Sequence, residues 1–160
     1  MPVRFAPLQD ARADALALWE GAAVRTPFAH PAFVEAAEHA FGLRPVVGLG
    51  DGVGVVGLEK SRGPVRALAL PPATTYVAPI LTKWPQEAET VKRTTALDAL
   101  AGALSGQFAQ ATLSLPPDWP DARPFAWNGW RLETRYTALA DLTGDPIARM
   151  SHGTRQPALR

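Results

Sequence analysis

The chain has no cysteine and only three histidines, and its acidic and basic residues nearly balance. The absence of cysteine excludes disulfides, thiolate catalysis and metal sites with cysteine ligands. Lysine and arginine together number 16 and aspartate and glutamate 15, which leaves a formal charge of +1. No global field therefore marks the chain as a binder of nucleic acid or of an anionic membrane surface.

Long apolar runs are also lacking. The N-terminal stretch MPVRFAPLQDARADALALWE places charged residues inside its apolar part, so it is neither a signal peptide nor a membrane span. We therefore expect a cytoplasmic protein. With 160 residues, of which 47% are hydrophobic, the chain can bury one substantial core, and a single domain is expected.

The histidines do not form a metal-binding pattern. His30, His39 and His152 lie far apart in the sequence and have no nearby carboxylates with ligand spacing. We expect His30 to cap a helix and His39 to pair with Glu35 one turn away, and His152 lies in the C-terminal segment. The lack of a Gly-x-Ser-x-Gly elbow argues against a Ser-His-Asp hydrolase. No metal site and no catalytic residue are predicted.

A series of glycines between positions 48 and 57 invites a phosphate-loop interpretation. Such loops lie between a strand and a helix, where helix amides face the phosphate. Strand-like sequence on both sides favours a hairpin instead. The nearby basic cluster of Lys60, Arg62 and Arg66 flanks a turn, for which we expect solvation, with an anion contact as the alternative.

Hydrophobic periodicity predicts the remaining elements. Strands are expected at 3–8, 76–82, 111–115 and 131–142, with a three-stranded antiparallel meander from Arg44 that turns at Asp51-Gly52 and Arg62-Gly63-Pro64. Helices are expected after an Asp10 cap up to Gly21, from Pro31 to Phe41 with Gly42 left-handed, and over 87–108. The order predicts an α/β domain with a mixed, mostly antiparallel sheet.

Two tryptophans surround an Asn-Gly in Trp127-Asn128-Gly129-Trp130. They could form an aromatic platform for a ligand, but a turn that begins the last strand is the preferred interpretation. Strand alternation would then pack Trp130 and Tyr136 inside, while Arg135 points away from the core.

Several of these segments together resemble a known family. The run Arg123-Pro124-Phe125-x-Trp127-x-Gly129-Trp130, the later Arg135-Tyr136-Thr137 and Asp141-Leu142, and the earlier Thr26-Pro27-Phe28, Tyr76-Val77-Ala78-Pro79 and Leu113-Ser114-Leu115-Pro116-Pro117 follow one another in the order found in FemAB-type, tandem GNAT-like acyl-CoA N-acyltransferases. The resemblance implies a GNAT-like fold and an N-terminal half of such a protein. Residues 1–143 would form the GNAT-like N-terminal domain and residues 144–160 a tail or crossover toward a second domain.

The resemblance also bears on the cofactor. A GNAT domain binds acyl-CoA where its fourth and fifth strands splay apart, with the pyrophosphate on a glycine-containing loop that opens the following helix. The corresponding stretch here, 82–89, has no glycine and includes Glu87 and Glu89, which repel a pyrophosphate and which Lys83 offsets only in part. No cofactor is therefore expected in this chain, although acyl-CoA is the family's cofactor.

We accordingly expect an acyltransferase-like domain for N-acyl or aminoacyl transfer that shapes the acceptor side, binds a small-molecule or peptide amine, and pairs with a second GNAT-like domain or a second copy of itself. The alternatives are a non-catalytic binding or dimerisation module and a complete acetyl-CoA-dependent N-acetyltransferase. Exposed aromatic or basic character near strand ends selects the candidate substrate-binding residues Tyr76, Trp84, Trp127, Arg135 and Tyr136.

Overall fold

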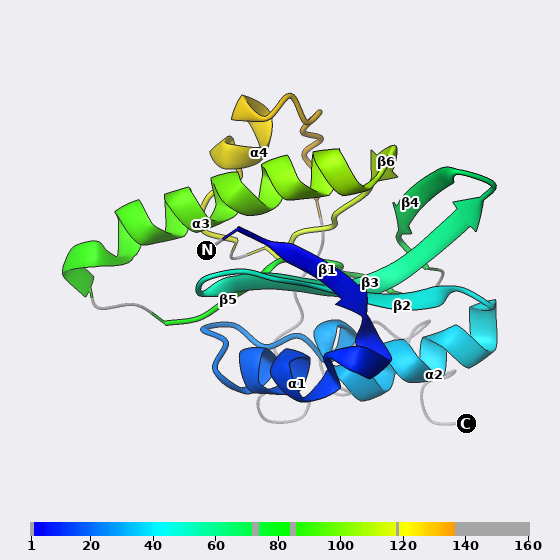
Figure 1. Cartoon of the computed structure of the whole chain (residues 1–160). Coiled ribbons are helices and arrows are strands. Elements are labelled where there is room, and N and C mark those ends of the chain that lie inside the picture. The colour runs from blue at the N-terminus through cyan, green and yellow to red at the C-terminus, as the bar shows by residue number, and fades with distance from the viewer. Residues whose placement is uncertain (1, 72–73, 84–85, 118, 137–160) are drawn as a thin grey trace, which may run out of the picture.

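The computed structural model describes residues 2–71, 74–83, 86–117 and 119–136 (Figure 1). The helices are α1 (Arg12–Glu20), α2 (Pro31–Phe41), α3 (Gln86–Gln107) and α4 (Arg123–Trp127), with short 3₁₀ turns at Leu8–Asp10 and Pro27–Ala29. The strands are β1 (Arg4–Pro7), β2 (Arg44–Leu49), β3 (Val53–Arg62), β4 (Val65–Ala69), β5 (Ile80–Leu81) and β6 (Gln110–Ala111). The predicted α/β class with a mostly antiparallel sheet is confirmed.

All six of these strands belong to one sheet, in the order β1-β2-β3-β4-β6, with β5 also paired to β3. The pairs among β1 to β5 are antiparallel, whereas β6 runs parallel to β4 after the crossover through α3. The predicted meander is present, and Gly52 and Gly63 occupy its turns with φ of 68° and 59°, where a side chain would be strained. These strands form the rigid frame beside which the candidate site lies.

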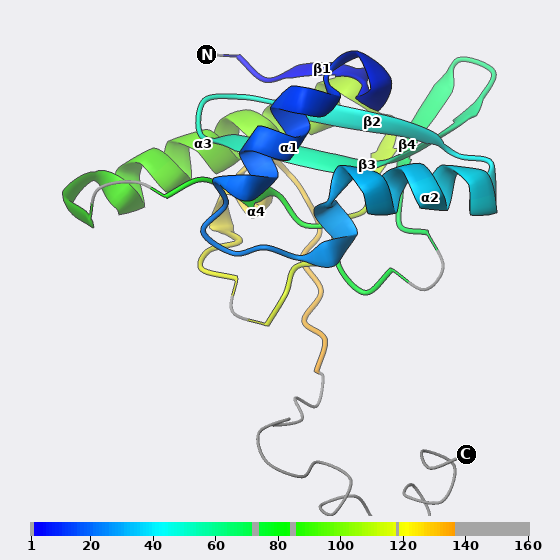
Figure 2. The same ribbon diagram turned by 90° about the horizontal axis from the view of Figure 1, so that it is seen from below.

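Helices cover both faces of the sheet (Figures 1 and 2): α1 and α2 lie on one face and α3 on the other, with α4 packed on α3. Residues of β3 alternate between two cores. Val53 and Val55 pack with the α3 side chains Leu97 and Leu100, whereas Val56 packs toward α1 and α2. This burial on both faces explains the continuous apolar sequence of the first part of β3, residues 53–58, because neither face meets water there.

The helix boundaries follow the sequence closely, with two corrections. Asp10 does not cap α1: it ends the preceding 3₁₀ turn, and Ala11 occupies the cap position without a side-chain bond. His30 does cap α2, where its Nδ1 accepts from the Ala32 amide at 3.1 Å, and Gly42 ends the helix with φ of 64°.

The second correction concerns α2 itself. His39 contacts the Glu35 carbonyl oxygen at 2.9 Å, because the Glu35 carboxylate is already engaged by Arg12 at 2.7 Å. The helix buries Val34 and Ala37, whereas Phe41 at its end is 40% exposed.

The predicted strand over 76–82 is much shorter than expected. Only β5 joins β3, at its beginning, while β4 occupies the other end of the same edge. The intervening chain leaves the edge, and Val77 forms an isolated bridge with Ser114 instead. Pro79 lies immediately before β5, where it lacks the N–H that a continuous ladder would require.

The predicted long strand 131–142 is wrong for the part that the structure describes. Residues 131–136 are in neither strand nor helix, and Tyr136, predicted to pack inside, is 96% exposed. The preceding segment is the short helix α4, which Gly129 ends with φ of 79°. The remainder of this strand, residues 137–142, and the tail 144–160 lie outside the described residues, as does His152.

Candidate functional site

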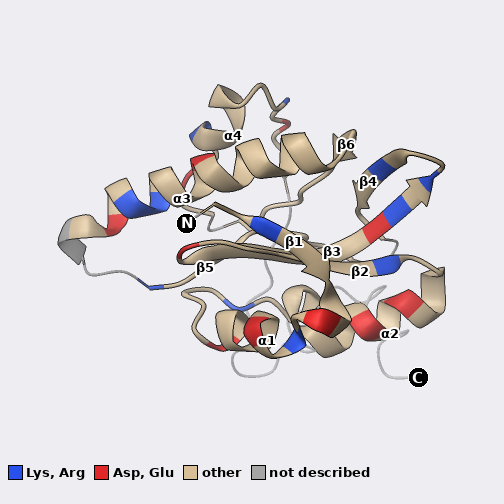
Figure 3. Ribbon diagram, in the orientation of Figure 1, with Lys and Arg blue, Asp and Glu red and all other residues tan. Residues whose placement is uncertain are grey.

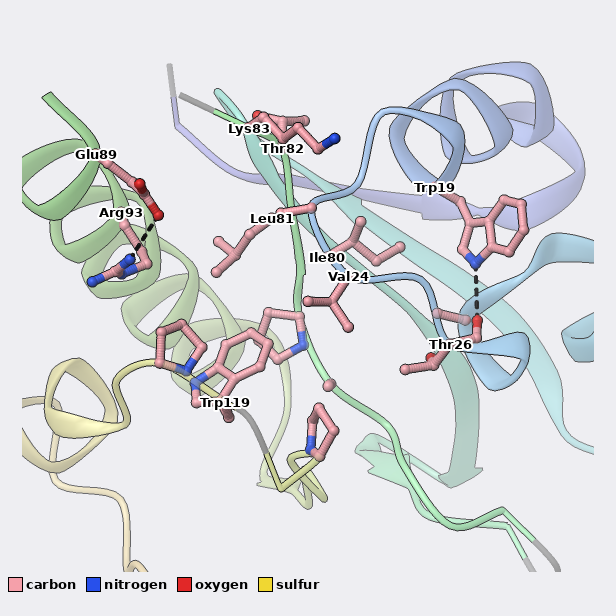
Figure 4. Close-up of a pocket in the computed structure, with 16 residues that line it drawn as sticks. Trp19, Val24, Thr26, Ile80, Leu81, Thr82, Lys83, Glu89, Arg93 and Trp119 are labelled. Atoms are coloured by element: carbon pink, nitrogen blue, oxygen red, sulfur yellow. Dashed lines mark hydrogen bonds and ion pairs between the residues drawn. The ribbon is translucent and has the colours of Figure 1, made fainter. Parts of the chain in front are cut away.

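A cavity of about 410 Å³ opens beside β5 (Figure 4). Four segments far apart in the sequence line it: the connection from α1 to α2, the chain from Ala78 to Lys83, the first turns of α3, and the proline-rich connection at Pro116–Pro120. Its volume is in the range of small-molecule sites. It is the main candidate site among the described residues.

The cavity walls are mostly apolar and held in place by polar contacts behind them. Ile80 and Leu81 present buried side chains from the sheet edge. Trp19 lies opposite, with its indole N–H donating to the Thr26 carbonyl at 2.9 Å (Figure 4). Trp119 closes a further side, and its indole N–H donates to the Asp121 carbonyl at 2.9 Å. Both indole donors are therefore satisfied. The Trp19 ring also packs edge-to-face with His30 at 4.6 Å and has the Arg25 guanidinium 5.5 Å from its centroid.

The charged residues of the lining gather where the chain enters α3. Lys83 precedes the helix, and Glu89 and Arg93 lie on its first turns (Figure 4). Arg93 donates from Nη1 to the Glu89 carboxylate at 3.0 Å. The Arg93 side chain is 18% exposed, against 48% for Glu89. This end of the cavity thus combines two cations with one anion.

A neighbouring ion pair fixes the proline-rich connection. The Asp121 carboxylate, 5% exposed, accepts from Arg123 Nε at 2.9 Å and from Nη2 at 2.9 Å. This bidentate bond lowers the pKa of Asp121 below its ordinary value, and the charge of Arg93 contributes in the same direction. The pair anchors the start of α4 and holds Trp119 against the cavity.

Beside the cavity, the chain itself fills the gap between β4 and the segment that follows β6. The Ser114 amide donates to the Val77 carbonyl at 3.0 Å, and the Ser114 hydroxyl donates to the Thr75 carbonyl at 2.8 Å. Val77 and Ala78 are both 5% exposed. Past Thr112, whose amide still bonds to the Leu68 carbonyl, the chain pairs with the β4–β5 connection rather than standing open.

The five residues predicted to bind substrate do not come together. Tyr76 lies near the cavity but packs against Phe28, with ring centroids 6.2 Å apart. Trp127 is 62% exposed on α4, Arg135 borders a different hollow beside the chain after β6, and Tyr136 is exposed to solvent. Trp84 lies outside the described residues. None of the four described residues lines the main cavity.

Lys83 and Glu89, which do line the cavity, were named from the sequence only in relation to a pyrophosphate, and none of the lining residues was predicted to bind substrate. Trp19 and Arg93 fell within predicted helices, and Trp119 fell between two predicted strands. One signal was available, since a tryptophan flanked by prolines in a connection has no secondary-structure role. The convergence of four separate segments, however, has no local signature.

The basic cluster forms a different, structural arrangement (Figure 3). Arg66 does not point into solvent as predicted: it binds the fully covered Glu59 carboxylate at 2.6 and 2.9 Å, and Arg44 and Ser61 each add a bond at 2.7 Å. These bonds lower the pKa of Glu59 to about 2. Lys60 and Arg62 are exposed, as expected. This cluster ties β2, β3 and β4 together.

No helix among the described residues is long and apolar enough to cross a membrane, and no group of three or more histidine, aspartate or glutamate side chains there could hold a metal ion. Comparison of the chain with family models, curated proteins and solved structures gives no match.

Proposed function

We propose that this chain is an acyltransferase-like domain that binds the amine acceptor of an N-acyl or aminoacyl transfer reaction and has no acyl-CoA site of its own. The proposal rests mainly on one observation. The gap between β4 and the chain after β6 is closed, whereas the cavity beside β5 is open. Val77 and Ser114 are hydrogen bonded to each other, and in a GNAT-like arrangement this bond would close the place between two splayed strands where acyl-CoA enters. The adjoining cavity remains free for a small ligand.

The topology supports the GNAT-like component of this proposal. Antiparallel strands β1 to β5 are followed by the crossover helix α3, after which β6 returns parallel to β4. The resemblance noted in the sequence implies the same succession of a fourth strand, a helix and a splayed partner strand. Because unrelated functions share folds, the site and not the topology must carry the assignment.

The electrostatics at the start of α3 favour the acceptor role over the cofactor role. Glu89 places a carboxylate on the first turns of this helix, where a pyrophosphate would need to approach. Arg93 offsets the charge of this carboxylate, but the contact occupies the Nη1 donor of Arg93. A small ligand that enters beside β5 needs no pyrophosphate contact at the start of this helix, and positioning of an amine is the main task of an acceptor site.

Fluorine NMR of protein labelled with 5-fluorotryptophan tests the proposal. Trp19 and Trp119 line the cavity, whereas the exposed Trp127 lies away from it and serves as the internal control. A small primary amine, isopentylamine, should shift the first two resonances saturably and leave the third unchanged. Single Trp→Phe variants assign the signals.

Acetyl-CoA provides the second arm. It should shift none of the three resonances and should not raise the melting temperature, although a ligand at a hundredfold its Kd would stabilise the fold by about 2.7 kcal/mol. Saturable acetyl-CoA binding with formation of N-acetylated amine would identify a complete enzyme and overturn the proposal. The acceptor role also fails if amine-bearing ligands leave Trp19 and Trp119 unshifted.

A further inference from the structure

Arg93 lies in the cavity wall, where its charge also acts on the Asp121 carboxylate. Its only side-chain hydrogen bond among the described residues is the one from Nη1 to Glu89. Its Nε is covered, and no described residue accepts a bond from it. A guanidinium carries five N–H donors, and leaving one covered and unbonded costs free energy. Its Nη2 makes no hydrogen bond to a described residue, so it can donate to a ligand.

The charge balance of the cavity is suited to an anion. Among the described residues that line it, Lys83 and Arg93 are the cations and Glu89 is the anion. Glu89 is about half exposed, so water screens its charge more than that of the largely covered Arg93. The planar guanidinium matches the geometry of a carboxylate, to which it can donate two parallel bonds.

The remainder of the cavity determines which chemical group the rest of the ligand should carry. Ile80, Leu81 and the rings of Trp19 and Trp119 surround the space away from Arg93. The indole N–H groups already have carbonyl acceptors. The two tryptophans therefore contribute apolar surface and no free indole donor to these walls. A compact branched or ring-shaped apolar group gains free energy by covering them.

We propose that the ligand of this cavity is a small amino carboxylate, whose carboxylate is bound by Arg93 and whose apolar group packs between Trp19 and Trp119. The amine part of this assignment rests on the proposed acceptor function, whereas the carboxylate part rests on Arg93 alone. Arg93 is thus a binding and specificity residue, and Glu89 competes with the ligand for its Nη1 donor.

Four probes of similar size separate the two parts: leucine has both charged groups, leucinamide and isopentylamine lack the carboxylate, and 4-methylpentanoate lacks the amine. In fluorotryptophan NMR, leucine should bind with a Kd at least about tenfold lower than leucinamide, because a bond to a charged group is lost in the amide. The resonances of Trp19 and Trp119 should shift together, with Trp127 unchanged.

Variants test the residue itself. Arg93→Gln should weaken leucine binding by about tenfold or more while leaving isopentylamine binding within about twofold. Arg93→Lys should recover part of the lost affinity, since it keeps the charge without the planar fork. Glu89→Gln should strengthen leucine binding by releasing Nη1. Arg135→Gln, an exposed arginine outside the cavity, is the matched control and should change nothing.

The outcomes separate the two proposals. Equal affinity for leucine and leucinamide, or unchanged leucine binding in Arg93→Gln, overturns the carboxylate site and leaves the acceptor role standing. If 4-methylpentanoate binds as tightly as leucine and isopentylamine does not bind, the carboxylate site is supported and the acceptor role fails. The comparison of the four probes uses only the unaltered protein, so an unfolded variant cannot obscure it. Absence of binding by all four probes overturns both.

Discussion

The Ser114 amide donates to the Val77 carbonyl across 3.0 Å, and this bond joins two segments that belong to no continuous strand ladder. It closes the sheet edge between β4 and the chain after β6. This bond, the Glu59 ion pairs, the packing at Gly54 and the packing of Trp130 each lead to a prediction that does not depend on the binding experiments above.

The first prediction concerns the Ser114–Val77 bond. The Ser114 amide should exchange its hydrogen on the order of a hundredfold more slowly than a free peptide, because exchange requires the closed edge to open. The neighbouring Leu113 amide makes no backbone hydrogen bond to a described residue and is the control. Fast exchange at both positions, measured by amide NMR, would show that the edge is open in solution.

The second prediction concerns Glu59. Its pKa is lowered from 4.5 to about 2 in the folded protein, first by the bond from Arg66. A lowered carboxylate pKa stabilises the fold above the unfolded pKa, and this stabilisation is lost as the pH falls from about 4.5 to about 2. The shift corresponds to about 3 kcal/mol.

Glu59→Gln should therefore lower the free energy of unfolding at pH 7 by about 3 kcal/mol, and the difference from the unaltered protein should shrink toward pH 2. Urea unfolding at several pH values measures it. Glu133→Gln, whose side chain is 62% exposed, is the control and should stay within about 0.5 kcal/mol. A pH-independent difference would contradict the assigned role of the carboxylate charge.

The third prediction concerns close packing at Gly54. A Cβ at this position would collide with Leu18 and lie 2.6 Å from the Gly48 carbonyl oxygen. Gly54→Ala should destabilise the protein by about 1–3 kcal/mol, because backbone and not only a flexible side chain must move. In Gly106→Ala, the new methyl group has no atom within 4 Å, and the helix should gain about 0.5–1 kcal/mol. Equal melting temperatures for the two variants would contradict this packing.

The fourth prediction separates the two tryptophans around the Asn-Gly. The Trp130 indole N–H donates to the Ser105 hydroxyl at 3.0 Å, and its ring packs edge-on to Phe125 at 5.3 Å. Trp130→Phe should lower the free energy of unfolding by about 1–2 kcal/mol. Trp127→Phe should change it by less than about 0.5 kcal/mol because Trp127 is largely exposed. The reverse ranking in urea unfolding would show that Trp127 is the packed residue.

Much of the fold followed from local patterns. The meander was predictable because its valine-rich runs are separated by turn sequences whose glycines adopt positive φ. The second helix was predictable because Pro31 suits a first helical position and Gly42 a left-handed end. These features depend on a few neighbouring residues, so the sequence displays them directly.

The failures share a different cause. Residues 131–136 alternate like a strand, but no ladder forms along them, since a strand also needs a partner edge that local sequence does not specify. Likewise, Arg66 resembles a solvated turn residue until β3 folds and places Glu59 beside it. Both outcomes depend on which distant segment arrives at the same place.

The sequence by itself determined the class of the domain, the antiparallel meander and the limits of the α2 helix, since these arise from backbone preference and periodic burial. Only the tertiary structure decided that Val77 closes the sheet edge and that Trp19, Ile80, Arg93 and Trp119 surround one cavity. These residues come from four separate segments, and their proximity results from packing both helical layers onto one sheet, which no local pattern encodes.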